Sequence, residues 1–393
     1  MKSPSRWPVH LAPIDGEALS SWLRRLAGSY EMTVGQLIEH GLGLDPNVER
    51  GLDRDPPDVL LDALEHRTGI SHDRLREMCL AGWAPWLLDS LEADPAGFDP
   101  YVRQFSVLLK SGKRSKHSAG PWVAWTPREA VQRACPQCMQ DPDRQGLLLI
   151  WQLPLSLSCP GHGVMLEPCI GFPGDYVGWT GDDAGPHAAS EAVSAMDRRT
   201  EQALTAGCVE LPGRAVHAGV WFRLLRTILD EVSTPAVYWT SRAADLRLIW
   251  TSCGLPVRAG KAVWRPYEAF PWPVQAQLLE AAAHAMRLLE DGTVRGRGIQ
   301  AELFAPPVQE PVNDGRAQHR DASAEQWTLL QAAIEDAVEA ARDDPADAQR
   351  LYNLFIYGCR TQQSVERLRS TFAELGIPTA DLSHDPDLSL IHI

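Results

Sequence analysis

Two short motifs constrain this chain more than any other feature. Cys135 and Cys138 form a C-x2-C pair, twenty residues follow, and Cys159 and His162 then form a C-x2-H pair. A gap of two residues lets both side chains of a pair point at one ion from a tight turn, and the intervening proline and glycine favour such turns. Four nitrogen and sulfur ligands complete a tetrahedron and leave no position open for water. The spacing therefore predicts a structural zinc site.

These residues admit two other interpretations. Clustered cysteines can be buried as small hydrophobic residues that meet by chance. A zinc deaminase also carries a P-C-x-x-C motif, but its signature needs a His-x-Glu or Cys-x-Glu tripeptide upstream. No such tripeptide precedes Cys135. Structural zinc remains the prediction.

The charge balance limits how this chain meets nucleic acid. Thirty-seven basic and fifty-one acidic residues give a net charge of −14 and an isoelectric point near 5.3. Such a surface repels a phosphate backbone as a whole, so any contact with nucleic acid must be local. The N-terminus has no apolar signal-peptide region, and eight cysteines are too sparse for a disulfide scaffold. We expect a cytoplasmic protein without a membrane anchor.

The first ninety-five residues carry the pattern of short amphipathic helices. Apolar residues follow the i, i+3, i+4, i+7 spacing of a helix with one buried face at Leu19, Trp22, Leu23 and Leu26. Thr33 and Gln36 have the spacing of a capping box, and Gly69 and Ser71 predict a helix end and a helix start. Two interpretations stay open, a small helical bundle and a helix-turn-helix that contacts DNA.

One stretch of the sequence is clearly basic. No acidic residue lies between Arg103 and His117. The candidate nucleic-acid-binding residues of this stretch are Lys110, Lys113, Arg114 and Lys116. The alternative is a solvated loop.

Several segments without helical periodicity separate the patterned regions. Residues 92–100 and 171–190 have the composition of linkers, and residues 291–324 predict a long loop. The apolar run 147–158 is expected to form one or two strands that bring the two Cys-Pro motifs together. Helical patterns are found at residues 220–232, 276–289, 327–341 and 351–375. The final residues, LSLIHI, continue no earlier pattern.

Motifs of catalysis are missing from the sequence. It has no nucleophile elbow, no phosphate-binding glycine loop followed by lysine and no paired-carboxylate motif. We expect a binding protein and not an enzyme.

Three sequence stretches together resemble the TniQ family of transposition accessory proteins (TnsD/TniQ type). They are PIDGEALSSWLRRLA at Pro13–Ala27, ACPQC at Ala134–Cys138 and WQLPLSLSCPGHGVMLEPC at Trp151–Cys169. The resemblance implies a helix-turn-helix domain formed by the N-terminal helices and zinc held by Cys135, Cys138, Cys159 and His162. The family often has a further C-x2-C after the histidine. Here Phe172 stands where the partner of Cys169 would be expected, so we expect one zinc ion.

The resemblance also implies a set of partners. In such transposons a DDE transposase cuts and joins DNA, an AAA+ ATPase connects it to the target, and the TniQ-type protein helps to select or license the site. Its own contact would be target DNA or a CRISPR effector complex. A homodimer is left open. The alternative function is a free-standing, zinc-containing, sequence-specific DNA-binding regulator.

The predicted architecture is mostly α with a small zinc-ribbon-like β module. Residues 1–95 are expected to form the N-terminal helical, helix-turn-helix-like domain, residues 96–175 the zinc-binding module, and residues 176–393 a C-terminal helical domain that includes the loop near 291–324.

Overall fold

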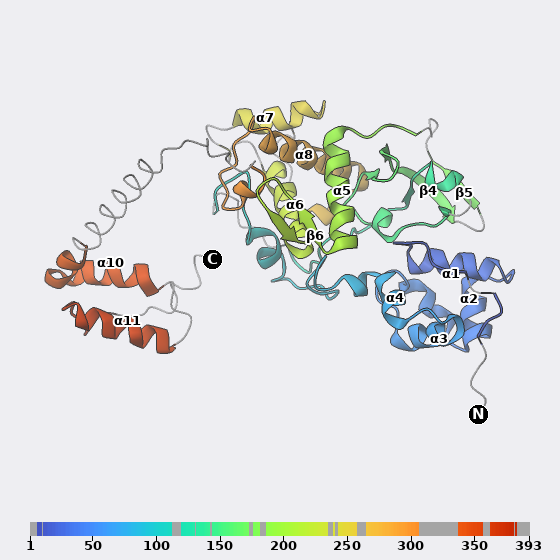
Figure 1. The fold of residues 1–393 in the computed structure, drawn as a ribbon, viewed down its shortest axis with the longest axis horizontal. Coiled ribbons are helices and arrows are strands. Elements are labelled where there is room, and N and C mark those ends of the chain that lie inside the picture. The colour runs from blue at the N-terminus through green and yellow to red at the C-terminus, as the bar shows by residue number, and fades with distance from the viewer. Residues whose placement is uncertain are drawn as a thin grey trace, which may run out of the picture. The chain divides into compact units, whose positions relative to one another are not determined.

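The computed structural model divides the chain into two compact units, Met1–Pro307 and Val308–Ile393. The structure describes residues 6–9, 11–111, 119–129, 131–141, 144–172, 176–180, 186–234, 239, 243–257, 265–305, 337–356, 362–380 and 382. Helices dominate these residues and the strands are short (Figure 1). None of the described helices combines the length and the apolar character needed to span a lipid bilayer.

The N-terminal part of the first unit is a cluster of short helices around its own apolar core. Its elements are α1 (Leu19–Gly28), α2 (Val34–Gln36), η1 (Leu37–Leu42), η2 (Pro46–Gly51), α3 (Asp58–Thr68), α4 (His72–Glu77) and η3 (Leu80–Trp83). The predicted apolar face of α1 is fully buried. The capping box is present, because the Gln36 N–H donates to the Thr33 hydroxyl and the Thr33 N–H donates to the Gln36 side chain. Ser71 caps α4, as predicted.

A small β region follows. This region follows η4 (Asp99–Arg103). Besides its strands it contains two 3-10 turns, η5 (Cys138–Gln140) and η7 (Leu149–Gln152). The antiparallel order β1-β4-β5 makes one sheet, and β2 pairs with β3 in a separate hairpin. The strands are β1 (Arg133–Ala134), β2 (Ser158–Cys159), β3 (Val164–Met165), β4 (Glu167–Phe172) and β5 (Tyr176–Trp179). In register, Cys159 faces Val164 and Cys169 faces Trp179.

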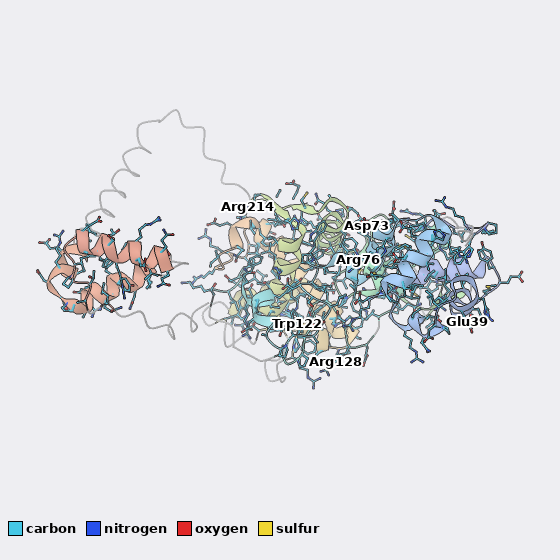
Figure 2. All side chains as sticks on the ribbon, turned by 90° about the horizontal axis from the view of Figure 1, so that it is seen from below. Glu39, Asp73, Arg76, Trp122, Arg128 and Arg214 are labelled. Atoms are coloured by element: carbon cyan, nitrogen blue, oxygen red, sulfur yellow. The ribbon has the colours of Figure 1, made fainter. Side chains whose placement is uncertain are left out.

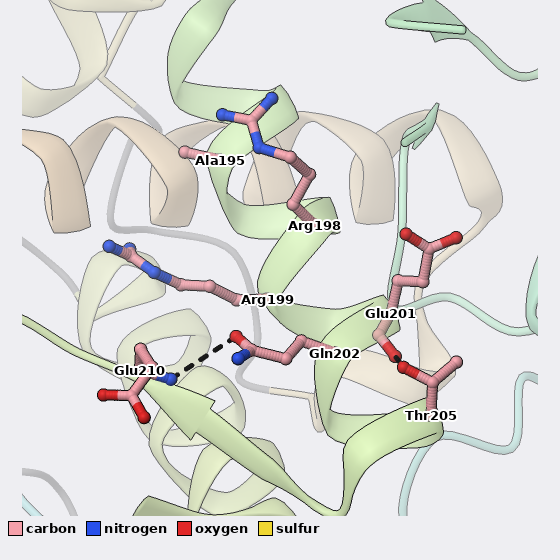
Figure 3. Close-up of a pocket in the computed structure, with 7 residues that line it drawn as sticks. All are labelled: Ala195, Arg198, Arg199, Glu201, Gln202, Thr205 and Glu210. Atoms are coloured by element: carbon pink, nitrogen blue, oxygen red, sulfur yellow. Dashed lines mark hydrogen bonds between the residues drawn. The ribbon is translucent and has the colours of Figure 1, made fainter. Parts of the chain in front are cut away.

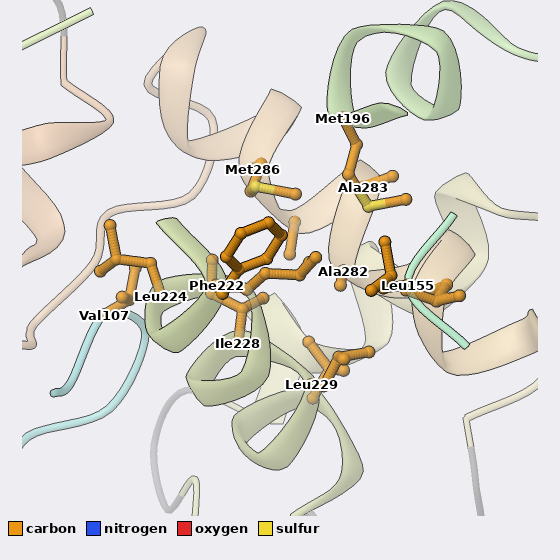
Figure 4. Close-up of a cluster of buried hydrophobic side chains, with 14 of the residues drawn as sticks. Val107, Leu155, Met196, Phe222, Leu224, Ile228, Leu229, Ala282, Ala283 and Met286 are labelled. Atoms are coloured by element: carbon orange, nitrogen blue, oxygen red, sulfur yellow. The ribbon is translucent and has the colours of Figure 1, made fainter. Parts of the chain in front are cut away.

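The largest apolar core lies among three helices that contact one another: α5 (Glu191–Ala206), α6 (Ala218–Ser233) and α8 (Trp272–Glu290). Phe222, Ile228 and Met286 are among the buried side chains between them (Figure 4). The predicted helices at 220–232 and 276–289 are confirmed as α6 and α8. The remaining elements of this part are β6 (Cys208–Glu210), β7 (Ala215–His217), α7 (Ala243–Ser252), η9 (Tyr267–Ala269) and η10 (Ala301–Leu303).

This large core also collects side chains from earlier in the chain. Phe98, Trp122 and Leu155 belong to it. The buried Glu268 carboxylate accepts hydrogen bonds from the Trp122 indole at 2.7 Å and from Arg226 at 2.9 Å. Packing therefore ties segments of the predicted zinc module to the helices that follow it, and the three-domain division stays a prediction.

Two sequence predictions are wrong. The apolar run 147–158, expected to be strands, forms η7 and irregular backbone, and only its last residue, Ser158, enters a strand. Three of its carbonyl groups bind a buried arginine, described below, and Pro154 has no N–H to donate to a sheet. The supposed linker 171–190 contains most of the β4–β5 hairpin. Val177 and Trp179, residue types that favour strands, outweigh the glycines around them.

The second unit has a small core of its own. Its described elements include residues 337–343, which are helical, α10 (Pro345–Ile356) and α11 (Gln362–Glu374). The buried rings of Tyr352 and Phe372 meet edge to face with centroids 5.7 Å apart. Residues 291–305 are irregular apart from η10, in agreement with the predicted loop, and the rest of that loop lies outside the described residues.

Candidate metal centre and its supports

The structure brings together Cys135, Cys138, Cys159 and His162, with all four donor atoms within 4.8 Å of one another. The Sγ atoms of Cys138 and Cys159 are 3.8 Å apart, and His162 Nδ1 lies 3.4, 3.3 and 3.6 Å from the three sulfurs in chain order. Tetrahedral zinc with Zn–S of about 2.3 Å and Zn–N of about 2.0 Å requires S–S edges of about 3.8 Å and S–N edges of about 3.5 Å. The residues therefore fit zinc, with His162 binding through Nδ1. Zinc ligation itself stays a prediction.

Local backbone geometry explains why the two motifs converge. The Cys138 N–H lies 3.4 Å from Cys135 Sγ, so the first turn directs a donor at a sulfur. In the second motif, the N–H groups of His162 and Gly163 both donate to the Cys159 carbonyl, which closes the turn between β2 and β3. Each motif is therefore a closed turn that holds its two ligands on one side.

Burial and charge favour a bound cation at this place. The three cysteines are at most 6% exposed. Hydrogen bonds from the thiols of Cys138 and Cys159 lower the pKa of Cys135, whereas the pKa of Cys138 rises because its proton is held in these bonds and because the site is buried. Three thiols this close can all ionise only when a divalent cation neutralises their charge. A closed set of four ligands is suited to folding and not to catalysis.

Arg133, two residues before the first ligand, organises the backbone beside the centre. Its fully buried guanidinium donates to the carbonyl oxygens of Trp151 at 3.1 Å, Leu153 at 2.8 Å and Ser156 at 2.7 Å. The same group lies 3.8 Å from the ring centroid of Trp272 in α8. Burial lowers the pKa of Arg133 to about 10. This residue links the metal centre to the large helical core.

Asp197 of α5 supports the second Cys-Pro motif from the other side. One of its carboxylate oxygens accepts hydrogen bonds from the N–H groups of Leu157 at 3.1 Å and Ser158 at 2.6 Å, and from the Ser158 hydroxyl at 2.6 Å. Ser158 directly precedes Cys159 in β2. Burial raises the pKa of Asp197 to about 7.

The N-terminal helices are joined to the metal centre through the segment that separates its two ligand pairs. The Leu147 carbonyl accepts from the Ala18 N–H, the Gly16 carbonyl accepts from the Leu149 N–H, and both bonds are 2.9 Å long. The Leu147 N–H donates to the Ser21 hydroxyl at 2.9 Å. We call these contacts between residues 16–21 and residues 147–149 the N-terminal joint; they comprise two backbone hydrogen bonds and one hydrogen bond to a side chain.

Glu17 completes the joint. Its fully buried carboxylate accepts from the Ser21 hydroxyl at 2.9 Å and from the Arg25 guanidinium at 2.8 and 2.7 Å. A paired carboxylate of this kind holds the Ser21 hydroxyl in the orientation that leaves its oxygen free to accept. Glu17, Ser21 and Arg25 belong to the motif PIDGEALSSWLRRLA, which thus makes an interface inside the chain.

The predicted nucleic-acid-binding residues are described only in part. Lys110 is exposed. Lys113, Arg114 and Lys116 lie outside the described residues. The DNA-contacting interpretation of the N-terminal helices stays a prediction. Two arginines of α4 already pair with carboxylates: Arg74 with Asp15 at 2.8 Å, and Arg76, labelled in Figure 2, with Asp58 at 3.4 Å.

A shallow surface pocket on α5 and β6 is a weaker candidate site. Figure 3 shows its lining residues, Ala195, Arg198, Arg199, Glu201, Gln202, Thr205 and Glu210. Arg199 already pairs with Glu290 at 2.6 Å, and the Gln202 side chain accepts from the Glu210 N–H at 3.4 Å. Two of the polar side chains that line this pocket are therefore already engaged in contacts within the chain.

The four ligand candidates are recognisable in the sequence, but the residues that support them are not. Arg133 and Asp197 gave no signal because isolated charged residues are usually solvated, and only their burial shows what they bind. Glu17, Ser21 and Arg25 were visible only as members of a motif, and the motif did not say which segment they contact.

A comparison with known protein families finds a match in the part of the chain that contains the metal centre. Residues 8–166 match the family described as TniQ. The matched region contains the N-terminal helices, the joint at Ser21 and Leu147, and all four side chains of the metal centre. No curated protein and no solved structure matches the chain. Over residues 8–166, the chain is therefore similar to the TniQ family.

Proposed function

We propose that this protein is an accessory protein of a heteromeric transposon, which helps to select or license the target site. In this role it links DNA or a targeting complex to an AAA+ transposition ATPase and a DDE transposase. The TniQ family consists of non-catalytic accessory proteins, and the match over residues 8–166 is the observation that carries the proposal. The alternative of a free-standing DNA-binding regulator is not favoured by this match.

The burial and the contacts of the metal centre support a role of this centre in holding the protein's helices in place. Its three cysteines are buried, its four donors form a closed set, and it lies between the N-terminal helices and α5, with contacts to both through Ser21 and Asp197. A metal ion here would hold the two groups of helices in one arrangement. An adaptor that must present surfaces to several partners at once needs such a fixed arrangement.

Charge supports a protein partner for the N-terminal helices. Residues 1–95 contain sixteen acidic and nine basic residues. The pairing of Arg74 and Arg76 with carboxylates further reduces the charge available to a phosphate backbone. We infer that these helices contact a protein of the transposition complex.

A transposition assay tests the proposal. The host cells carry the transposon with this gene deleted. They are complemented with the gene for the wild-type protein, for Cys159→Ser or for Cys208→Ser, and the insertion sites are then sequenced. Cys208 is an exposed cysteine in β6 and makes a matched control. We expect targeted insertion with the wild type and Cys208→Ser but not with Cys159→Ser. Unchanged frequency and distribution of insertions after gene deletion would refute the function.

A further inference from the structure

A second group of side chains that can bind a metal ion lies on the N-terminal helices. It consists of Asp62 and Glu65 of α3 and His72, the first residue of α4. One donor atom from each of the three lies within 4.8 Å of the others. The donors differ in kind from those of the cysteine centre, because two carboxylate oxygens and one imidazole nitrogen take the place of sulfur. Divalent transition-metal ions bind such mixed sets of nitrogen and oxygen.

The turn between α3 and α4 explains how these residues meet. Asp62 and Glu65 are three positions apart in α3 and therefore lie on one face of that helix. Gly69 ends α3 in the left-handed conformation, with φ of 79°, so the chain reverses and α4 starts beside α3 (Figure 1). Leu64 and Leu75, one from each helix, are fully buried in the same apolar core. Packing of the two helices therefore sets the distance between His72 and the carboxylates.

His72 has a carboxylate at each of its two ring nitrogens. Nδ1 lies 2.8 Å from Asp62 Oδ1, and Nε2 lies 3.6 Å from Asp58 Oδ1. Neighbouring ligands of an ion with bonds of about 2.1 Å lie about 3.0–3.4 Å apart, so a movement of a few tenths of an ångström between His72 and Asp62 would admit an ion. The N–H at Nε2 would then face Asp58. Histidines that bind metal usually have a carboxylate at the second nitrogen, which orients the ring.

Negative charge is concentrated along this face of α3. Residues 58–65 contain Asp58, Asp62 and Glu65 but no basic residue. Carboxylates three or four positions apart on a helix repel one another. Arg76 of α4 pairs with Asp58 at 3.4 Å, and a divalent cation between Asp62 and Glu65 would offset the repulsion that remains. The side chain of Asp62 is 68% exposed and that of His72 27%, so an ion can enter from solvent and keep bound water.

We propose that Asp62, Glu65 and His72 bind a second divalent transition-metal ion, of the type of Zn²⁺, with water completing its coordination. The ion would join α3 to the first turn of α4 and stiffen this pair of helices. The imidazole separates the site from a purely acidic surface, because a nitrogen ligand favours zinc over magnesium. The proposal does not depend on a role in transposition. Its test uses the purified protein alone, so its failure would leave the proposed function unchanged.

Isothermal titration calorimetry with Zn²⁺ tests the site on the full-length protein, after the cysteine centre has been filled and excess metal removed by dialysis. The test variants are His72→Gln and Asp62→Asn/Glu65→Gln. The control is His187→Gln, because His187 Nδ1 also lies 2.9 Å from a carboxylate, that of Glu167, yet no third donor joins this pair within the described part of the chain. Circular dichroism and the zinc content before titration establish that each variant is folded.

The wild type and His187→Gln should each bind one further zinc ion per chain. Both test variants should bind it at least about tenfold more weakly, and Asp58→Asn, which removes the carboxylate at the second ring nitrogen, about tenfold more weakly. Magnesium in about hundredfold excess should not displace the zinc. Added zinc should also raise the unfolding temperature of the wild type but not that of His72→Gln, since only a ligand that binds the folded state stabilises it.

Three results would overturn the proposal. The first is a wild type that binds no further zinc. The second is unchanged affinity in His72→Gln, or displacement of the zinc by magnesium, because either would reduce the site to an acidic surface. The third is an equal loss of affinity in His187→Gln and His72→Gln, which would mean that zinc binds to surface histidines in general.

Discussion

The Ser21 hydroxyl oxygen accepts a hydrogen bond of 2.9 Å from the backbone N–H of Leu147. One residue belongs to the first helix, and the other lies between the two ligand pairs of the metal centre. The N-terminal helices and the metal centre are therefore parts of one structure, and damage to either is expected to affect the other.

Ser21→Ala should lower the free energy of unfolding by about 1–3 kcal/mol, because the buried Leu147 N–H loses its acceptor. Urea unfolding measures the change. Ser29→Ala is the control: that exposed hydroxyl donates to the Leu26 carbonyl, and its loss should change stability by about 0.5 kcal/mol or less. Equal effects of the two substitutions would argue against the joint.

Cys159→Ser should remove the metal and unfold the region around it. Structural zinc supplies apparent folding free energy on the order of 10 kcal/mol, and three remaining ligands cannot replace a closed tetrahedron. Zinc content and thermal unfolding measure the result, and Cys208→Ser should keep both unchanged. A Cys159→Ser protein that stays folded and loaded with zinc would contradict the structural role.

Asp197 should make stability depend on pH. Burial raises its pKa from 3.8 to about 7, so the folded state holds this proton more tightly than the unfolded state. Between about pH 4 and pH 7 the folded chain binds more protons, and stability therefore falls as pH rises through this window. Asp197→Asn cannot ionise and should lack this component. Urea unfolding from pH 5.5 to 8 compares the two slopes, and identical slopes would show that Asp197 stays ionised throughout.

Gly298→Ala should destabilise the first unit by about 1–3 kcal/mol, because the added Cβ has no room beside the Ser106 carbonyl. The control is Gly51→Ala, where an added Cβ would meet no atom within 4 Å. Urea unfolding compares the two variants, and equal stability would show that the backbone near Ser106 accommodates the added Cβ.

The sequence alone predicted the structural features that depend on residues close together in the chain. The buried face of α1, the capping box at Thr33 and the turns of the two Cys-Pro motifs depend on residues within a few positions of one another, so spacing alone predicted them. The four ligand candidates were found for the same reason. Residues 171–190 have the composition of a linker and yet include strand residues of the β4–β5 hairpin, because pairing is decided between strands and not within one.

Contacts between distant segments were decided only by the tertiary structure. The apolar run at 147–158 has the composition of a strand, yet three of its carbonyl groups accept hydrogen bonds from Arg133. No local sequence pattern indicates that an arginine is buried. The backbone near Gly298 lies against Ser106, nearly two hundred residues earlier, and only glycine leaves room for this contact. Local periodicity records which face of a segment is buried, but the partner that buries it is set by the packing of the whole chain.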